Sequence, residues 1–294
     1  MRICTSNLQL HMEHNEYAVA KWVKFFRVSR SGYYAHMQCR ESREQEKNRL
    51  KAVIKQIFEE SGGTYGPGRI CGILRRNGCK ASYGKIGGHM ADMGLCSVHN
   101  RHRTRSLTNS KKSRGAGFPN LTRGQSFSAP RQALCSDITH LKSGEGWLYL
   151  CTVKDIVSGE ILGEAMSENM KKEPVMQAFL NAQAGHSLPS GTIFHSGRGC
   201  QYTSKEFTDI LKIYGIRQSF SRVGMPGDNA WAESFFATLK KECVHFNHFA
   251  TREELKQTVF AWIEGFYNIG RVQARLGYVS PKCCAQTLLE RSAA

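Results

Sequence analysis

The sequence predicts an α/β domain that follows an all-α region. Over residues 15–95 the apolar side chains recur at the three-to-four-residue spacing of amphipathic helices. From residue 131 the pattern changes to three short strand-like runs in succession, with turn signals between them. Helices and strands then alternate to about residue 244. Successive strands followed by such alternation indicate a mixed sheet that is covered by helices.

The N-terminal region is expected to contain five helices. Their expected limits are residues 16–26, a short helix after a turn within 28–34, and then 41–60, 69–77 and 82–93. Gly78 and Gly94 end the last two, because glycine commonly stands just after a helix. Two short helices joined by a tight turn form the helix-turn-helix plan, whose second helix can enter the major groove of DNA. A plain helical bundle would show the same pattern.

Residues 97–130 have the composition of a basic linker. The segment contains no acidic residue and several Ser, Gly and Asn. Its seven positive side chains are Arg101, Arg103, Arg105, Lys111, Lys112, Arg114 and Arg123. Such a run favours contact with phosphates, although a solvated connector would have a similar composition. The expected organisation is a helical DNA-binding region over 1–96, the basic linker over 97–130 and a catalytic domain over 131–294.

The elements of the C-terminal domain follow from the alternation of apolar residues and from turn signals. Strands are expected over 134–141, 147–153, 160–166, 192–194 and 216–220, and helices over 171–184, 204–214 and 229–244. Gly144 and Gly146 mark a hairpin between the first two strands. This order of elements fits a ribonuclease-H-like core.

The charge of the chain makes a polyanion its leading partner. There are 41 Lys and Arg against 24 Asp and Glu, which gives a formal net charge of +17. A membrane surface is the rival polyanion, but no run approaches the roughly 18 apolar residues of a spanning helix, and no signal-peptide pattern is present. The 11 cysteines form no CxxC pair, so we expect reduced cysteines and no zinc site. Nucleic acid in the cytoplasm is therefore the expected partner.

Two acids and one glycine form the most informative pattern in the chain. Asp137 lies in a strand-like run, and Glu233 lies in the first turns of a helix. Gly197 stands at a strand end that precedes a helix start, and thirty-five residues separate it from Glu233. Acids that converge at the carboxyl ends of strands would bind Mg²⁺, and a pair of such ions serves phosphoryl transfer. The neighbouring His195 is expected to be a packed histidine rather than a catalytic one.

Five groups of residues extend this pattern. They are Ser136-Asp137-Ile138-Thr139, His195-Ser196-x-Arg198-Gly199-x-Gln201-Tyr202, Ala232-Glu233-Ser234-Phe235-Phe236, Leu239-Lys240-x-Glu242, and Tyr267-Asn268 with Leu276-Gly277-Tyr278-x-Ser280-Pro281. On these residues the chain, from about 15 to 281, resembles the integrase-core transposases of bacterial insertion sequences, which are related to retroviral integrases. The spacing resembles their Asp, Asp, 35 residues, Glu triad, with Gly197 in place of the second Asp.

The resemblance implies roles for the residues that match. Asp137 and Glu233 correspond to the first and third catalytic acids, which hold Mg²⁺ or Mn²⁺. Lys240 matches the basic residue seven positions after the catalytic Glu and is expected to meet DNA, as are Arg198 and Tyr202 beside the second ligand position. The expected DNA contacts of the basic linker are Arg101, Arg103, Arg105, Lys111 and Lys112.

Three positions depart from the family pattern. Gly197 removes a metal ligand, so we expect weakened metal binding and an activity about a thousandfold or more below that of an intact relative. Asp228 or Asp209 could supply a replacement, but no spacing argument supports either. Leu134 and Gln273 stand where tryptophan and histidine are common, and these two changes concern packing.

The expected function is DNA transposition or integration on double-stranded element ends and target DNA, impaired by Gly197. The resemblance also implies a homo-oligomer, since two ends react together, and a place in the bacterial cytoplasm at the nucleoid. A DNA-binding regulator without catalysis would share the charge and the helices, and metal-dependent activity separates the two. An enzyme that cleaves RNA hybrids fits the core but leaves the helix-turn-helix without a role.

Overall fold

The computed structural model describes residues 19, 23–24, 29–100 and 119–293. The chain groups into two compact units, residues 1–57 and 58–294. Most of the expected helix over 16–26 and most of the basic linker lie outside the described residues. The division does not coincide with the expected domain boundary at residue 96, because the helical segment that follows residue 58 belongs to the same unit as the core.

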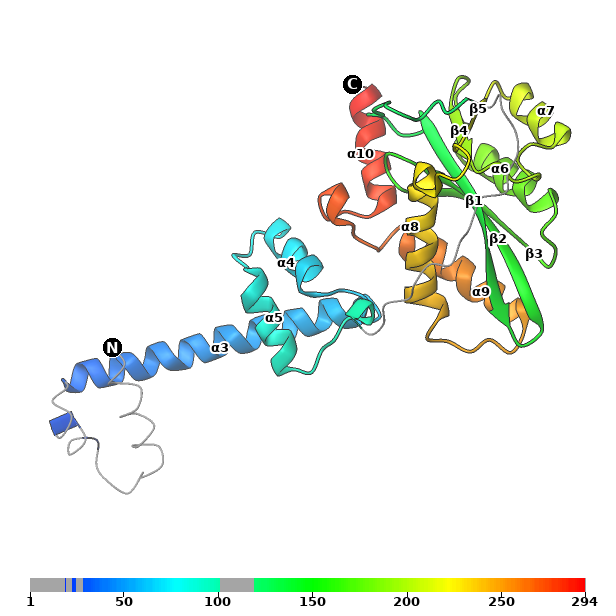
Figure 1. Cartoon of the computed structure of the whole chain (residues 1–294). Coiled ribbons are helices and arrows are strands. Elements are labelled where there is room, and N and C mark those ends of the chain that lie inside the picture. The colour runs from blue at the N-terminus through cyan, green and yellow to red at the C-terminus, as the bar shows by residue number, and fades with distance from the viewer. Residues whose placement is uncertain (1–18, 20–22, 25–28, 101–118, 294) are drawn as a thin grey trace. The chain divides into compact units, whose positions relative to one another are not determined.

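A single helix, α3 (Arg30–Glu60), replaces the two helices that were expected between residues 28 and 60 (Figure 1). Ser29 stands just before it, and its hydroxyl accepts a hydrogen bond from the Gly32 amide at 3.0 Å. The Ser and Gly residues at 29–32 therefore start the helix instead of breaking it. No proline or glycine follows before residue 60, so nothing interrupts the helix.

Two short helices joined by a turn follow, as the sequence predicts. They are α4 (Pro67–Arg76) and α5 (Tyr83–Asp92), and the short helix η1 (Val98–Asn100) comes after them. Gly78 adopts a φ of +80° in the turn, a backbone conformation that favours glycine. The Ser82 hydroxyl caps α5 by accepting a hydrogen bond from the Lys85 amide at 3.3 Å. Apolar side chains from both helices are buried, namely Ile70, Cys71, Leu74, Ile86 and Met90.

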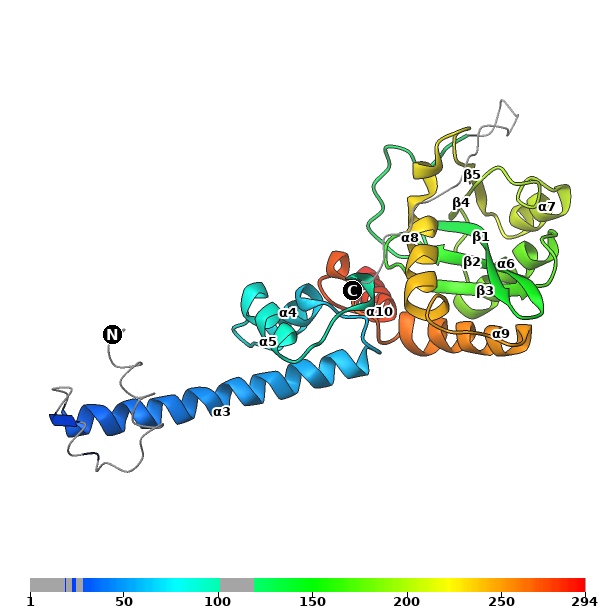
Figure 2. The ribbon, with the colours of Figure 1, turned by 60° about the horizontal axis from the view of Figure 1, so that its bottom comes forward.

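Five strands form the sheet of the core (Figures 1 and 2). They are β1 (Ala133–Ser143), β2 (Gly146–Asp155), β3 (Ile161–Ser167), β4 (Ile193–Ser196) and β5 (Arg217–Phe220). Their order is β3-β2-β1-β4-β5. β1, β2 and β3 pair antiparallel, whereas β4 is parallel to β1 and β5 is parallel to β4. This mixed sheet confirms the predicted ribonuclease-H-like core.

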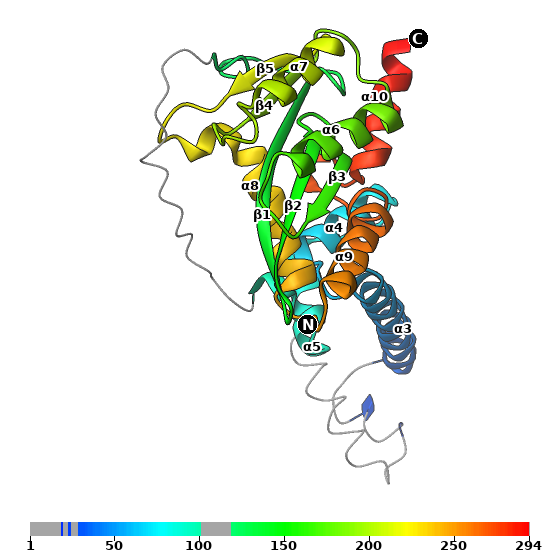
Figure 3. The same ribbon diagram turned by 90° about the vertical axis from the view of Figure 1, so that its right-hand side faces the viewer.

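Helices cover both faces of the sheet (Figures 2 and 3). On one face lie α6 (Glu173–His186) and α7 (Lys205–Ile213). On the other lie α8 (Ala230–Leu239) with its π-helical continuation η3 (Lys240–Val244), and α9 (Arg252–Ala261) with its π-helical continuation η4 (Trp262–Tyr267). The remaining elements are η2 (Pro226–Asn229), η5 (Ala274–Leu276) and α10 (Pro281–Ala293). No helix in the described ranges is both long and apolar enough to cross a membrane.

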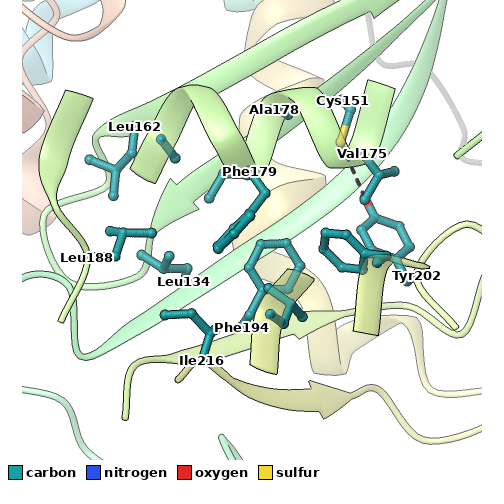
Figure 4. Packing of buried hydrophobic residues seen from close by; sticks show 14 of the residues in the cluster. Leu134, Cys151, Leu162, Val175, Ala178, Phe179, Leu188, Phe194, Tyr202 and Ile216 are labelled. Atoms are coloured by element: carbon teal, nitrogen blue, oxygen red, sulfur yellow. Dashed lines mark hydrogen bonds between the residues drawn. The ribbon is translucent and has the colours of Figure 1, made fainter. Parts of the chain in front are cut away.

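Each face of the sheet has its own apolar core. Successive residues of a strand point to opposite faces, so β2 contributes Cys151 and Val153 to one cluster and Leu148 and Leu150 to the other. In the first cluster, which Figure 4 shows, these side chains meet aromatic rings from α6, β4 and α7. The rings are those of Phe179, Phe194 and Phe207, which meet edge to face with centroids 5.4–6.1 Å apart.

The described part of the expected linker packs on the core. The Pro119 carbonyl accepts a hydrogen bond from the Phe220 amide at 2.9 Å, and the Leu121 amide donates to the Ser219 hydroxyl at 2.8 Å. Thr122 is buried as well. These contacts join residues 119–122 to β5, so this end of the segment is part of the core rather than a free connector.

Candidate active site

Asp137 and Gly197 lie side by side where β1 meets β4. The parallel pairing of these strands sets Ser136 opposite Ser196, and Asp137 and Gly197 are the next residues along each chain segment. β4 ends at Ser196, so position 197 stands at the carboxyl end of its strand, where such sheets place ligands. The Asp137 side chain is half-buried. The structure thus brings these two predicted positions together.

Helix α8 carries Glu233 at the same edge. α8 packs against β1, and the Asn229 side-chain amide donates a hydrogen bond to the Ser136 carbonyl at 3.1 Å. The ammonium group of the buried Lys154, on β2, donates to the Trp231 carbonyl at 2.8 Å. These two bonds fix the start of α8 over the strand that carries Asp137. Glu233 lies in the first turn of α8, and its side chain is exposed.

The charges of Glu233 and Lys240 both affect the pKa of Asp137. The pKa of the Asp137 carboxyl is raised from its ordinary value of 3.8 to about 6. Burial is the main cause and the negative charge of Glu233 adds to it, whereas the Ile138 amide and the charge of Lys240 act against it. Burial also raises the pKa of Glu233 and lowers that of Lys240. The Asp137 carboxyl therefore interacts electrostatically with both Glu233 and Lys240.

The backbone at Gly197 leaves room for a side chain. Its φ lies outside the left-handed region, and a Cβ built there has no heavy atom within 4 Å. The Cβ of an aspartate at this position would therefore meet no neighbour, and the backbone would not be strained. Within the described ranges, no three His, Cys, Asp or Glu side chains gather as a metal site. The carboxylates of Asp137 and Glu233 are oxygen ligands of the kind that Mg²⁺ prefers.

The two acids that could replace the missing ligand are engaged elsewhere. Arg222 donates from Nε and Nη2 to the two carboxylate oxygens of Asp228, at 3.0 Å each, and the Asn120 amide donates at 3.1 Å. The hydrogen bond from Arg222 is the largest cause that holds the pKa of Asp228 well below its usual range. Asp209 lies on α7, which covers the face of the sheet opposite α8. Its Oδ1 atom is 3.8 Å from Nζ of Lys212.

Tyr202 is a core residue, and the expectation that it contacts DNA is wrong. The residue is 2% exposed, and its phenol shares a hydrogen bond with the Ser136 hydroxyl at 2.9 Å. It shares another with the Cys151 thiol at 3.6 Å (Figure 4). The phenol supports the strand residue that precedes Asp137 instead of facing solvent. Arg198 is half-buried, and its Nε donates to the Ser221 carbonyl at 2.8 Å.

His195 is the packed histidine that the sequence predicts. Its two ring nitrogens share hydrogen bonds with the hydroxyls of Ser219, at 2.9 Å, and Ser221, at 3.1 Å. The residue is fully buried, and burial lowers the pKa of its imidazole. A neutral ring that is bonded on both sides has no free nitrogen for acid–base chemistry.

Some predicted residues lie elsewhere, and some supporting residues were missed. The predicted DNA contacts of the basic linker, which all lie outside the described residues, are Arg101, Arg103, Arg105, Lys111 and Lys112. Leu134 is fully buried in the cluster under α6, which makes it a packing residue. Sequence reasoning missed the role of Lys154, and it gave Asn229 only as a possible cap of the helix, whereas its side chain bonds β1. A single lysine at the end of an apolar strand was the available signal for the role of Lys154.

The matches to protein families cover both parts of the chain. Integrase core domains match residues 128–226 and 233–283, and an HTH-like domain matches residues 45–103. The mixed sheet and these matches define a transposase or integrase with a helix-turn-helix-like region.

Named relatives narrow this class. The transposase for insertion sequence element IS904 from Lactococcus lactis is 36% identical over 249 residues, which are 84% of this chain and 97% of the relative. The transposase InsF for insertion sequence IS3A from Escherichia coli K12 is 33% identical over 274 residues, 91% of this chain and 93% of the relative. The chain therefore belongs to the insertion-sequence transposases that have a retroviral-integrase-like core.

Solved structures that are similar to the chain include retroviral integrases. One is a simian T-cell lymphotropic virus intasome in complex with a PP2A regulatory subunit, with a TM-score of 0.47 at 16% identity over 75% of this chain and 74% of that chain. Another is the catalytic core domain of BIV integrase, with a TM-score of 0.41 at 15% identity over 55% of this chain and 97% of that chain.

Proposed function

We propose that this chain binds the double-stranded DNA ends of an insertion sequence and holds them at the edge that carries Asp137 and Glu233, with phosphoryl transfer impaired at Gly197. The family supports transposition as the activity. The open space beside position 197, next to two retained acids, is the observation that carries the impairment. The first and third acids remain in place, and only the second ligand is missing.

Asp137 and Glu233 are the residues that would hold Mg²⁺ or Mn²⁺. When bound, such ions activate an attacking hydroxyl group and stabilise the leaving oxygen. Burial and the negative charge of Glu233 disfavour the ionised form of Asp137. A bound cation would stabilise this form, because opposite charges attract. With two carboxylates instead of three, cation binding is weakened. The cost in rate is about tenfold for each 1.4 kcal/mol of lost transition-state stabilisation.

DNA is the substrate that the charge and the helices favour. Lys240 interacts electrostatically with Asp137, and it would place a positive charge at the scissile phosphate. The net charge of +17 and the HTH-like match support end binding, with further contacts from Arg198. Two DNA ends react together in transposition, so we propose a homo-oligomer that acts at the bacterial nucleoid. The linker contacts proposed are Arg101, Arg103, Arg105, Lys111 and Lys112.

A regulator of transposition that binds DNA without catalysis is the second candidate. Gly197 favours it, because a chain that occupies element ends but does not join them would compete with an active transposase. Both candidates share the DNA-binding surface, so only catalysis separates them.

The deciding experiment compares the chain with its Gly197→Asp variant in Mg²⁺-dependent joining of labelled element-end DNA. We expect the variant to be faster by about a thousandfold or more, because it restores the missing ligand. Gly185→Asp is the matched control, since Gly185 is an exposed position on α6 that also has open space. Equal and robust joining by the chain and the Gly197→Asp variant would refute the impairment. DNA binding without joining in either protein would favour the regulator.

A further inference from the structure

A buried ionic cluster lies in the unit 58–294, centred on Glu242. The Glu242 side chain has no exposed surface. Arg271 donates from Nε and Nη2 to its two carboxylate oxygens at 2.7 Å each, and His99 Nε2 lies 2.5 Å from Oε1. Arg69 Nη1 stands 3.6 Å from the same oxygen. Glu242, on η3, is thus the common partner of side chains from η1, from α4 and from the segment after η4.

Tyr65 makes a second connection between the same segments. Its hydroxyl donates a hydrogen bond to the Gly270 carbonyl at 3.2 Å and accepts one from the Val272 amide at 2.9 Å. The Arg69 guanidinium lies over the Tyr65 ring, 5.5 Å from its centre. The residues on either side of Arg271 are therefore bonded to the start of the helical segment that contains α4 and α5.

Glu242 shares a helix with the proposed catalytic residues. α8 carries Glu233, and η3 continues it with Lys240 and Glu242. The π-helical turn is closed by a hydrogen bond from the His245 amide to the Lys240 carbonyl at 2.7 Å. Side chains two positions apart in a helix point to nearly opposite sides. Lys240 accordingly interacts with Asp137, whereas Glu242 interacts with Arg271 and His99.

Stability alone is a poor explanation of this cluster. Apolar residues of similar volume commonly replace buried ion pairs without loss of stability, and the best-attested use of such pairs is to specify one arrangement. Burial would raise the pKa of Glu242, but hydrogen bonds from Arg271 and His99 outweigh it and hold the pKa at about 2. The carboxylate is therefore charged at every pH at which the protein works. π-helical turns are also frequent at functional sites.

We propose that Glu242 is a positioning residue that joins the helical segment 65–100 to the catalytic helix, so that DNA held by this segment fixes the position of Glu233 and Lys240. The proposal rests on the proposed function, because it takes α5 as a DNA-binding helix. It adds a physical connection between end recognition and the edge where the chemistry takes place.

Hydrogen exchange of the full chain, alone and with a mixed-sequence DNA duplex, tests the connection. Asn268, Gly270 and Arg271 donate their amides within the chain, and no DNA contact is proposed for them, so they report the state of the cluster. We expect DNA to slow exchange in α5 and also in residues 268–272. In Glu242→Gln, exchange in 268–272 and 98–100 should rise by about a hundredfold while β1 stays unchanged. DNA should then protect α5 only.

Controls and a second variant make the outcomes distinct. Glu206→Gln removes the carboxylate of the exposed Lys172–Glu206 pair and should behave like the unmodified chain. If Glu242→Gln loses protection throughout β1, Arg69→Met replaces it, because that change leaves the Arg271–Glu242 pair intact. Protection of α5 by DNA without any response in 268–272, or the same response in the variant, would overturn the connection and leave the proposed function standing. An α5 that DNA does not protect would overturn both.

Discussion

Replacing Asp137 by asparagine should make the protein more stable at alkaline pH. The folded state raises the pKa of this carboxyl from 3.8 to about 6. The folded protein therefore binds the proton more tightly than the unfolded chain, so the stability linked to this group is fully present below about pH 4 and is lost as the pH rises through about 6. The shift corresponds to about 3 kcal/mol at about 1.4 kcal/mol per unit of pKa. Because the side chain is partly exposed, we expect about 1–2 kcal/mol after screening by solvent.

Urea denaturation of the chain and of Asp137→Asn measures this difference. At about pH 8 the variant should unfold at a higher urea concentration, and the gap should close towards about pH 4. Mg²⁺ should narrow the gap at pH 8, since the ion stabilises only the protein that binds it. Asp209→Asn, on an exposed face of α7, should change stability by less than about 0.5 kcal/mol at either pH. If Asp137→Asn is less stable than the chain at pH 8, the ionised carboxylate stabilises the folded protein, and our account of its burial is wrong.

Three further predictions concern packing, pH and DNA. Gly163→Ala would bring a Cβ within 2.4 Å of the α6 backbone and should cost about 1–3 kcal/mol in urea denaturation, whereas Gly185→Ala, at an open position, should gain about 0.5–1 kcal/mol. Asp228→Asn removes the negative charge and one of the two oxygens that accept hydrogen bonds from Arg222. Because the pKa of Asp228 is depressed, its contribution is present above about pH 4 and is lost at lower pH, so the difference in melting temperature should vanish on acidification. Lys240→Met should lower the salt dependence of DNA binding by about one unit of slope, and an unchanged slope would exclude a phosphate contact.

Local patterns in the sequence were sufficient to predict the sheet and the elements that carry Asp137 and Glu233. Strand alternation placed Asp137 on β1, and the start of a helix placed Glu233 on α8. The position of Tyr202 could not be predicted, because its hydroxyl bonds Ser136 from 66 residues away and no local period reports such a contact. The partners His99 and Glu242 are separated by 143 residues for the same reason. Contacts over such distances are set by tertiary packing.

The Ser-Gly turn signal before α3 shows the opposite limitation. Ser29 and Gly32 are residue types that are typical of a loop, and the sequence predicts a turn here, a short helix after it and a separate helix from residue 41. In the structure the serine hydroxyl satisfies an amide of the first helical turn, so the same residues begin a helix. A capping serine and a turn serine are distinguished only by the backbone that follows.

The vacant space at position 197 bears on the evolutionary future of this element. Under the proposed function Gly197 is an inactivating substitution, and no heavy atom lies within 4 Å of a Cβ built at this position. Codons for glycine and aspartate can differ by a single base. Under the proposed function, a change from Gly197 to aspartate would return a carboxylate beside Asp137 without a clash at its Cβ, so transposition would be recoverable by one substitution.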